Sequence, residues 1–90
     1  MSPKEIPGWR LSADGKSIVA DLKMRDFMTA IRLIEQIACL AVEADHHPDV
    51  HLTGYRNLRL ELTTHSEGRL TQKDFELASK INALPKDLKE

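Results

Sequence analysis

Asp45-His46-His47-Pro48, at residues 45–48, decides where the chain must change from one secondary-structure element to the next. A proline forces the residue before it out of the helical region of backbone space. We therefore expect His47 to be extended, and a helix that arrives from the N-terminal side must end at about Asp45. Two imidazoles then lie at the junction between that helix and the next element. Histidine exchanges protons near neutral pH, so this corner is the first candidate for chemistry.

The residues before this corner predict a hairpin and then a long helix. Residues 9–13 and 17–23 alternate apolar and polar side chains, and Asp14-Gly15 between them is a strong signal for an antiparallel hairpin. Across residues 25–44, apolar side chains recur every three or four positions, which is typical of an amphipathic helix. They cover more than half of its circumference. We therefore expect one side to pack on the sheet and the other to meet another subunit, giving a homo-oligomer.

The residues after the corner predict a second hairpin and a second helix. Residues 50–53 and 55–64 are expected to be strands joined at a glycine, with alternate leucines of the longer strand on the core face. A loop at residues 65–68 leads to a helix that begins after Thr71 and ends at about Leu84. The predicted fold is α+β: a four-stranded antiparallel sheet with both helices packed on one face, in the order strand-strand-helix-strand-strand-helix.

Composition bounds the class of protein. Ninety residues with 41% hydrophobic and 30% charged side chains are typical of one small globular domain. We expect a single domain over residues 1–90, with an irregular leader at 1–8 and a frayed tail at 86–90. Thirteen basic residues are interleaved with fourteen acidic ones, which argues against nucleic-acid binding. No apolar run approaches the roughly 18 residues of a membrane span, and no signal region opens the chain, so we expect a cytoplasmic protein without membrane contact.

Three further side chains have ordinary structural explanations. Cys39 is the only cysteine and lies in an apolar run, so we expect a small buried residue rather than a reactive thiol. Trp9 is expected to be a core or interface aromatic, and Tyr55 to serve in packing.

A metal site is the weaker option for the histidines. His47 and His51 are four residues apart, but Pro48 forbids a helix there, and in a strand that spacing separates them by roughly 13 Å. A zinc site formed by His46, His47, His65 and a carboxylate stays open as the alternative. We favour a site without metal, and we expect His51 to be solvated.

Acid–base chemistry is the stronger option. His46 and His47 follow the long helix, and His65 follows the last strand; an antiparallel pairing of the two strands between them would bring His65 back to the pair. Three neutral imidazoles can both give and take a proton, which suits removal of water across a C–N bond without metal or cofactor. Each histidine alone could instead be a surface residue or a cap. Asp74 either caps the second helix, or it orients an imidazole or touches a ligand near the start of that helix.

At these residues the sequence resembles the pterin-4a-carbinolamine dehydratases, also known as the dimerisation cofactor family. The family signature is His-His-Pro, an aromatic residue, a histidine and an aspartate at set spacing. Here it reads as His46-His47-Pro48, Tyr55, His65 and Asp74. The resemblance runs from residue 7 to about residue 84.

The resemblance implies four antiparallel strands with helices on one side, assembled as a homodimer or homotetramer. It implies dehydration of 4a-hydroxytetrahydrobiopterin to the quinonoid dihydropterin, with no cofactor, in the recycling of tetrahydrobiopterin. Because aromatic amino acid hydroxylases use that pterin, a hydroxylase is a candidate partner.

The resemblance also assigns residues. His46 and His65 would be the acid and base, His47 would complete the pocket, and Asp74 would support it. The backbone of two segments would hold the pterin. These segments are residues 46–48 (His46, His47 and Pro48) and residues 64–67 (Thr64, His65, Ser66 and Glu67).

One departure from the family pattern gives a second hypothesis. Four positions before His46, where the family usually has an acidic residue, this chain has Val42. Glu43 is rotated by about 100° around the helix and cannot simply replace it. The alternative to an active dehydratase is therefore a catalytically weak or inactive pterin-binding or dimerisation module of the same family.

Overall fold

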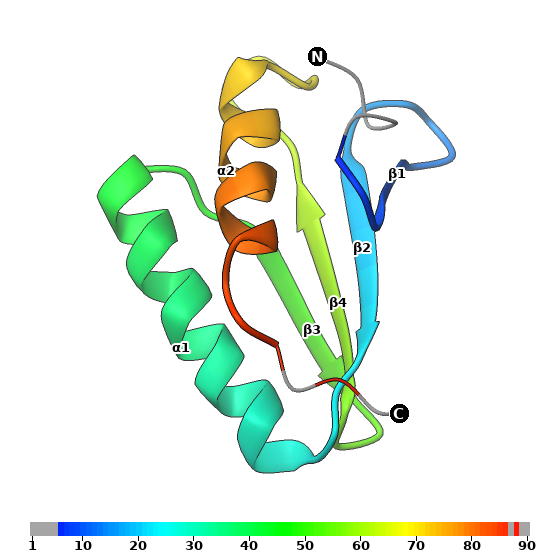
Figure 1. The fold of residues 1–90 in the computed structure, drawn as a ribbon. Coiled ribbons are helices and arrows are strands. Elements are labelled where there is room, and N and C mark those ends of the chain that lie inside the picture. Colours follow the sequence, from blue (N-terminus) through cyan, green and yellow to red (C-terminus); the bar gives the residue numbers. More distant parts are fainter. Residues whose placement is uncertain (1–5, 87, 89–90) are drawn as a thin grey trace.

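Two β-hairpins, each followed by a helix, make up the fold (Figure 1). The computed structural model describes residues 6–86 and residue 88. In chain order the elements are β1 (Trp9–Leu11), β2 (Ile18–Lys23), α1 (Phe27–Ala44), β3 (Asp49–Thr53), β4 (Asn57–Leu62) and α2 (Gln72–Asn82). Neighbouring strands are antiparallel and lie in the order β1-β2-β4-β3, so the predicted α+β class and element order are confirmed.

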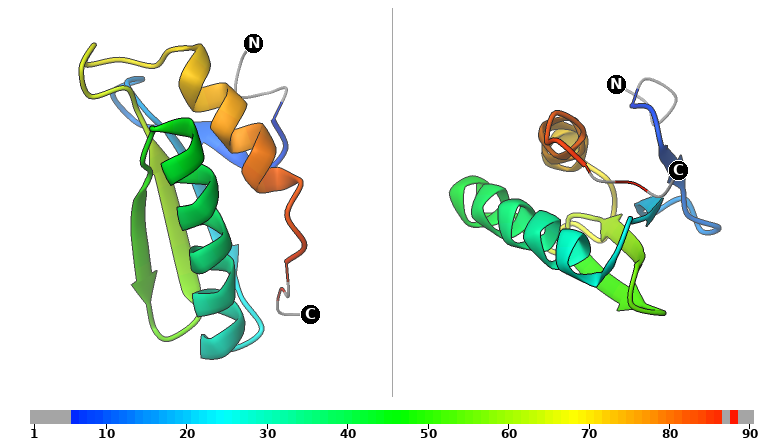
Figure 2. Two further views of the ribbon diagram at one scale, coloured as in Figure 1. Left: turned by 90° about the vertical axis from the view of Figure 1, so that its left-hand side faces the viewer. Right: turned by 60° about the horizontal axis from the view of Figure 1, so that its bottom comes forward.

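Both helices cover the same face of the sheet, and the core lies between the two layers (Figure 2). Successive side chains of a strand point to opposite faces. Leu58, Leu60 and Leu62 of β4 accordingly share the core face and are at most 1% exposed. Ile18 and Ala20 on the neighbouring β2 join them in the same cluster. The sequence predicted this face for the leucines correctly.

Helix α1 buries one stripe and leaves another uncovered. The buried side chains are Thr29, Ala30, Leu33, Ile37 and Ala41. Phe27, Met28 and Val42 are 48%, 54% and 71% exposed. The apolar surface of α1 is therefore wider than the part that the sheet covers. A second copy of the chain on the uncovered side remains a prediction.

Local hydrogen bonds and backbone geometry set the ends of α1. Asp26 accepts the Thr29 N–H at 2.9 Å, and the Thr29 hydroxyl accepts the Asp26 N–H at 3.1 Å. This capping box was not predicted, and it starts the helix two residues later than expected. The helix ends at Ala44, and Asp45, its C-cap residue three positions before Pro48, has a left-handed φ of 51°.

Two predictions about single residues are wrong. Cys39 is exposed because it falls on the uncovered side of α1. Tyr55 is 56% exposed rather than packed, and it has a left-handed φ of 56° in the turn after β3. Strand β4 therefore begins at Asn57 and not at residue 55. The Arg56 guanidinium lies over the Tyr55 ring, 5.1 Å from its centroid.

The segments before β1 and after α2 pack against the domain. Ile6 is 2% exposed, and Trp9 is a core aromatic whose Nε1 donates to Asn82 of α2 at 2.9 Å. Lys86 Nζ donates to three carbonyls at the end of α2, and burial lowers the pKa of this amine. Leu88 forms a β-bridge with the chain after β2. Lys86 and Leu88 are thus held rather than frayed, and the remaining residues of the predicted leader and tail (1–5, 87 and 89–90) lie outside the described part.

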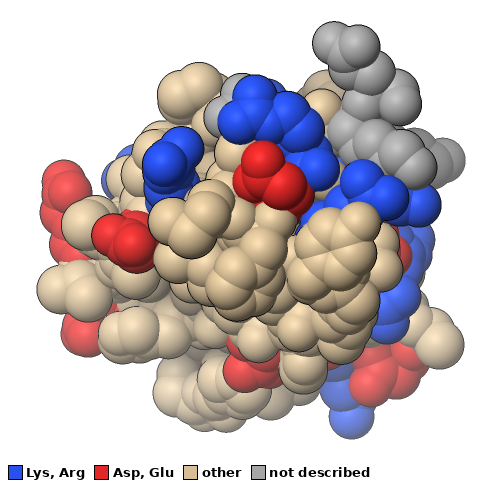
Figure 3. Space-filling model, turned by 90° about the horizontal axis from the view of Figure 1, so that it is seen from below, with Lys and Arg blue, Asp and Glu red and all other residues tan. Residues whose placement is uncertain are grey.

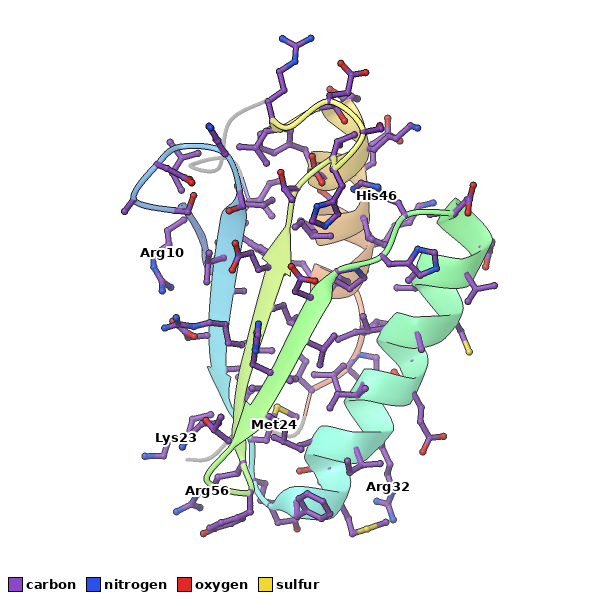
Figure 4. The ribbon with its side chains drawn as sticks, turned by 180° about the vertical axis from the view of Figure 1, so that it is seen from behind. Arg10, Lys23, Met24, Arg32, His46 and Arg56 are labelled. Carbon is purple, nitrogen blue, oxygen red and sulfur yellow. The ribbon has the colours of Figure 1, made fainter. Side chains whose placement is uncertain are left out.

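The outer face of the sheet carries charged side chains (Figure 4). Asp21 of β2 pairs with Arg10 and with Arg59, each at 2.7 Å. The hydrogen bond from Arg59 is the main reason that the pKa of Asp21 lies below its ordinary value of 3.8. Charges of both signs are also mixed at the end of the molecule that holds the β3–β4 turn (Figure 3). No helix within residues 6–86 is both long and apolar enough to cross a membrane.

Replacing a core leucine tests the placement of the core. Leu60 is 0% exposed, so Leu60→Ala is expected to lower the free energy of unfolding by about 2–5 kcal/mol through lost burial and a residual cavity. Urea unfolding followed by circular dichroism measures this. Leu11→Ala makes the same change at a leucine that is 50% exposed, and we expect a cost below about 1 kcal/mol. Equal costs would contradict the core described above.

The ion pairs on the outer face predict a pH dependence. The folded-state pKa of Asp21 is lowered, so its contribution to stability is fully present above the unfolded-state pKa and is lost as pH falls through the folded-state pKa. Asp21→Asn should therefore flatten the fall in the free energy of unfolding between about pH 5 and pH 2. Denaturant titrations at several pH values measure this. A variant with the same acid dependence as the wild type would show that the ion pairs contribute nothing.

Candidate functional site

The register of the second hairpin brings two distant segments together. Asp49 at the start of β3 pairs with Glu61 near the end of β4. Because these strands are antiparallel, the residues just before β3 and just after β4 meet at one end of the sheet. The loop after β4 is closed on itself, since the Thr64 carbonyl accepts the N–H groups of Glu67 and Gly68. His46 lies on the segment between α1 and β3, at this end of the sheet (Figure 4).

A hollow of about 320 Å³ opens where these segments meet. We call it the histidine hollow. Its lining consists of Asp45, His46, His47, Thr63, Thr64, His65, Ser66 and Lys73. The predicted convergence of His65 on the His46-His47 pair is confirmed as geometry. The volume is at the lower end of the range that binds small molecules.

His46 is held by a buried carboxylate. Its Nε2 lies 2.6 Å from Asp74 Oδ1, and the side chains are 10% and 0% exposed, respectively. Asp74 Oδ2 accepts the Thr64 hydroxyl and the Thr71 N–H, each at 2.9 Å. The Thr71 hydroxyl lies 2.7 Å from the Thr64 hydroxyl. Because the Thr64 hydroxyl already donates its hydrogen to Asp74, the Thr71 hydroxyl is the donor between these two. We call these four residues the Asp74 network.

The network fixes which atom of His46 can react. A carboxylate accepts and does not donate, so Nε2 carries the hydrogen that faces Asp74. Nδ1 is then the ring atom left to exchange a proton. The two interpretations of Asp74, a cap of α2 and an orienter of an imidazole, are both true. One oxygen accepts from the Thr71 backbone at the start of α2, and the other holds His46.

The other two imidazoles are exposed. His47 lines the histidine hollow on one side, and on the other it lines an apolar groove of about 170 Å³ between α1 and β3. His65 lies in the loop after β4. His51 is exposed on β3, as predicted, and lines a different hollow on the outer face of the sheet. That hollow is larger, at about 620 Å³, but His51 is its only histidine.

Some predicted site residues lie outside the lining of the histidine hollow, and some lining residues were missed. Pro48 faces the apolar groove, Asp74 lies behind His46, and the Glu67 side chain lies 3.4 Å from Arg69.

The lining residues that were missed are Asp45, Thr63 and Lys73. For two of these residues, a neighbouring position in the sequence could have indicated a place in the site. Asp45 directly precedes the histidine pair, and Lys73 directly precedes Asp74 in the first turn of α2.

Val42 belongs to the groove rather than to the histidine hollow. It lines the apolar groove together with His47 and Pro48. A carboxylate at this position would therefore approach His47 from the groove, and not His46 from the hollow.

The described residues do not form an obvious metal centre. Within residues 6–86 and 88, no group of three or more His, Cys, Asp or Glu side chains is arranged to hold an ion. The ring nitrogen of His46 that faces the protein interior is already in contact with Asp74.

Removing the buried carboxylate tests the network. Asp74→Ala leaves His46, Thr64 and the Thr71 N–H without their acceptor, so we expect the free energy of unfolding to fall by about 3 kcal/mol. Chemical denaturation measures the loss. Glu76→Ala removes an exposed acid from the same helix, and its effect should stay within about 0.5 kcal/mol. If the two variants were equally stable, Asp74 would not be anchoring this corner.

Comparison with known proteins identifies one family. Residues 1–84 match the family model described as pterin 4 alpha carbinolamine dehydratase. A Sulfolobus acidocaldarius protein named provisionally as such a dehydratase is 42% identical over 80 residues, which cover 89% of this chain and 85% of the relative. The mitochondrial pterin-4-alpha-carbinolamine dehydratase 2 of Arabidopsis thaliana is 35% identical over 83 residues, 90% of this chain but 44% of that longer protein.

A solved structure is similar to this chain in both fold and sequence. The crystal structure of a transcriptional coactivator/pterin dehydratase from Brucella melitensis superposes with a TM-score of 0.83 at 34% identity. The match covers 89% of this chain and 84% of the Brucella chain.

Proposed function

The chain belongs to the pterin 4 alpha carbinolamine dehydratase family, and on that premise we propose that it converts 4a-hydroxytetrahydrobiopterin to quinonoid dihydropterin and water. The observation that carries the proposal is the histidine hollow, where three imidazoles from two distant segments surround one space. One of the three is oriented by a buried carboxylate. This arrangement supports acid–base catalysis without a cofactor.

The reaction needs one proton given and one proton taken. In this step His46 starts protonated on both ring nitrogens: Asp74 holds the hydrogen on Nε2, and Nδ1 donates its hydrogen to the departing 4a-hydroxyl. His65 accepts the proton of N5 as the C4a–O bond breaks, the C4a=N5 double bond forms, and water leaves. The two transfers balance, so no electron donor or acceptor takes part. His47 completes the wall, and the backbone of residues 46–48 and 64–67 holds the pterin.

The wider biological setting follows from the same proposal. The enzyme acts in the cytoplasm as a homodimer or homotetramer and takes part in tetrahydrobiopterin recycling. Its product returns to an aromatic amino acid hydroxylase, which is the candidate partner. The exposed apolar residues Phe27, Met28 and Val42 on α1 support a partner on that side.

Loss of either reacting imidazole tests the enzyme proposal. His46→Ala and His65→Ala should each lower the dehydration rate by about 10²- to 10⁴-fold, because each removes a general acid or base. The assay generates the 4a-carbinolamine in solution and follows the quinonoid product against the spontaneous reaction. His51→Ala removes an exposed histidine outside the hollow and should keep the wild-type rate. A wild type no faster than the spontaneous reaction would refute the enzyme proposal.

A second candidate function is a pterin-binding or dimerisation module with little or no activity. Val42 at the usual acidic position favours it, as does the coactivator name of the Brucella relative. Val42→Glu separates the two candidates. If the wild type has no rate above background and Val42→Glu restores one, the module is the correct description. A wild-type rate that Val42→Glu leaves nearly unchanged supports the enzyme.

A further inference from the structure

Two opposite charges lie in the lining of the histidine hollow without a role in the mechanism above. Asp45 follows α1, and Lys73 lies in the first turn of α2; both residues are exposed. Within the described part of the chain, neither side chain makes a hydrogen bond or an ion pair. Their charges are therefore available to a ligand in the hollow.

Asp45 is poorly placed for the stability of the helix that it ends. The C-terminal end of an α-helix carries a partial negative charge, so a carboxylate there is unfavourable. Its φ of 51° is also a conformation that glycine or asparagine adopts at lower cost. Helix capping therefore does not explain an acidic residue at this position. Its presence in the lining of the hollow does explain it, if the carboxylate binds something there.

We propose that Asp45 and Lys73 orient the pterin by its pyrimidinone edge, an inference that rests on the function proposed above. That edge carries two adjacent donors, N3–H and the 2-amino group, which match the two oxygens of a carboxylate. Next to them lies one acceptor, the carbonyl O4, which matches a lysine ammonium. Asp45 accepts from the two donors, and Lys73 donates to O4. Because C4 is bonded to C4a, holding O4 sets the reacting carbon between His46 and His65.

The pairing also defines which ligands the hollow selects. A bicyclic ring with the same donor–donor–acceptor edge fits both charges. A pteridine with carbonyls at both positions 2 and 4 presents O2 to the Asp45 carboxylate instead of an amino group, and it should be rejected. Asp45 and Lys73 are thus specificity-determining residues, distinct from the histidines that move protons.

Asp45→Asn tests the carboxylate with almost no change of shape. Asparagine tolerates the left-handed conformation and has the same size, so only the charge and one acceptor are lost. We expect KM for the carbinolamine to rise about 10- to 100-fold, the range for loss of a charge-assisted hydrogen bond. We expect kcat to change less than about threefold, and Tm to stay level or rise because the charge at the helix end is gone. A titration with biopterin, an unreactive pterin with the same edge, should show the same weakening without turnover.

Matched variants separate ligand binding from general electrostatics. Glu43→Gln removes a neighbouring exposed acid from the end of α1 that does not line the hollow, so it should leave KM unchanged. Lys73→Met should raise KM in the same way as Asp45→Asn. Lys80→Met removes an exposed lysine near the other end of α2 and should leave KM unchanged.

The outcomes distinguish this inference from the proposed function. An active wild type whose KM is unaffected by Asp45→Asn and Lys73→Met overturns the inference alone. A fall in Tm and kcat with unchanged KM would make Asp45 a structural residue and would also overturn it. A wild type that neither turns over the carbinolamine nor binds biopterin overturns both. Higher KM in the two variants, with both controls at the wild-type value, supports the inference.

Discussion

The contact between His46 and Asp74 is the constraint on which the arrangement of this end of the molecule depends. A carboxylate that is 0% exposed must have its charge satisfied by hydrogen bonds, and Asp74 obtains them from His46, Thr64 and Thr71. These partners come from the α1–β3 corner, the end of β4 and the start of α2. One buried group therefore joins three segments that are up to 28 residues apart in the chain.

The same network links stability to chemistry. It immobilises one imidazole of the three and leaves His47 and His65 exposed at the hollow. A reaction that must both give and take a proton gains from such asymmetry, because one group is positioned in advance while the others stay accessible to the ligand. At Asp45, by contrast, stability of the helix and a role in the hollow do not coincide. It occupies a position where a helix gains nothing from a negative charge, and its carboxylate lines the hollow.

Much of the fold could be predicted because local patterns and tertiary packing agree. Alternation placed Leu58, Leu60 and Leu62 on the core face, and Pro48 placed the end of α1. Two predictions of burial failed. The exposure of a side chain also depends on which side of its element is covered and on the backbone conformation at that residue. Cys39 lies in an apolar run but on the uncovered side of α1, and Tyr55 has a strand-forming side chain but a turn conformation. Within the site, the sequence predicted the histidines and Asp74 but not Asp45, Thr63 or Lys73.

By itself the sequence determined the element types, their order and the residues with proton chemistry, because periodicity, proline geometry and side-chain pKa are properties of short segments. Antiparallel pairing also predicted that His65 returns to the histidine pair, but only the tertiary structure decided which side chains are in contact and at what distance. The register of β3 on β4 brings His65 to the histidine pair, and the docking of α2 places Asp74 behind His46 and Lys73 in the lining of the hollow. Such distances arise when distant segments pack against one another, and no local pattern encodes them.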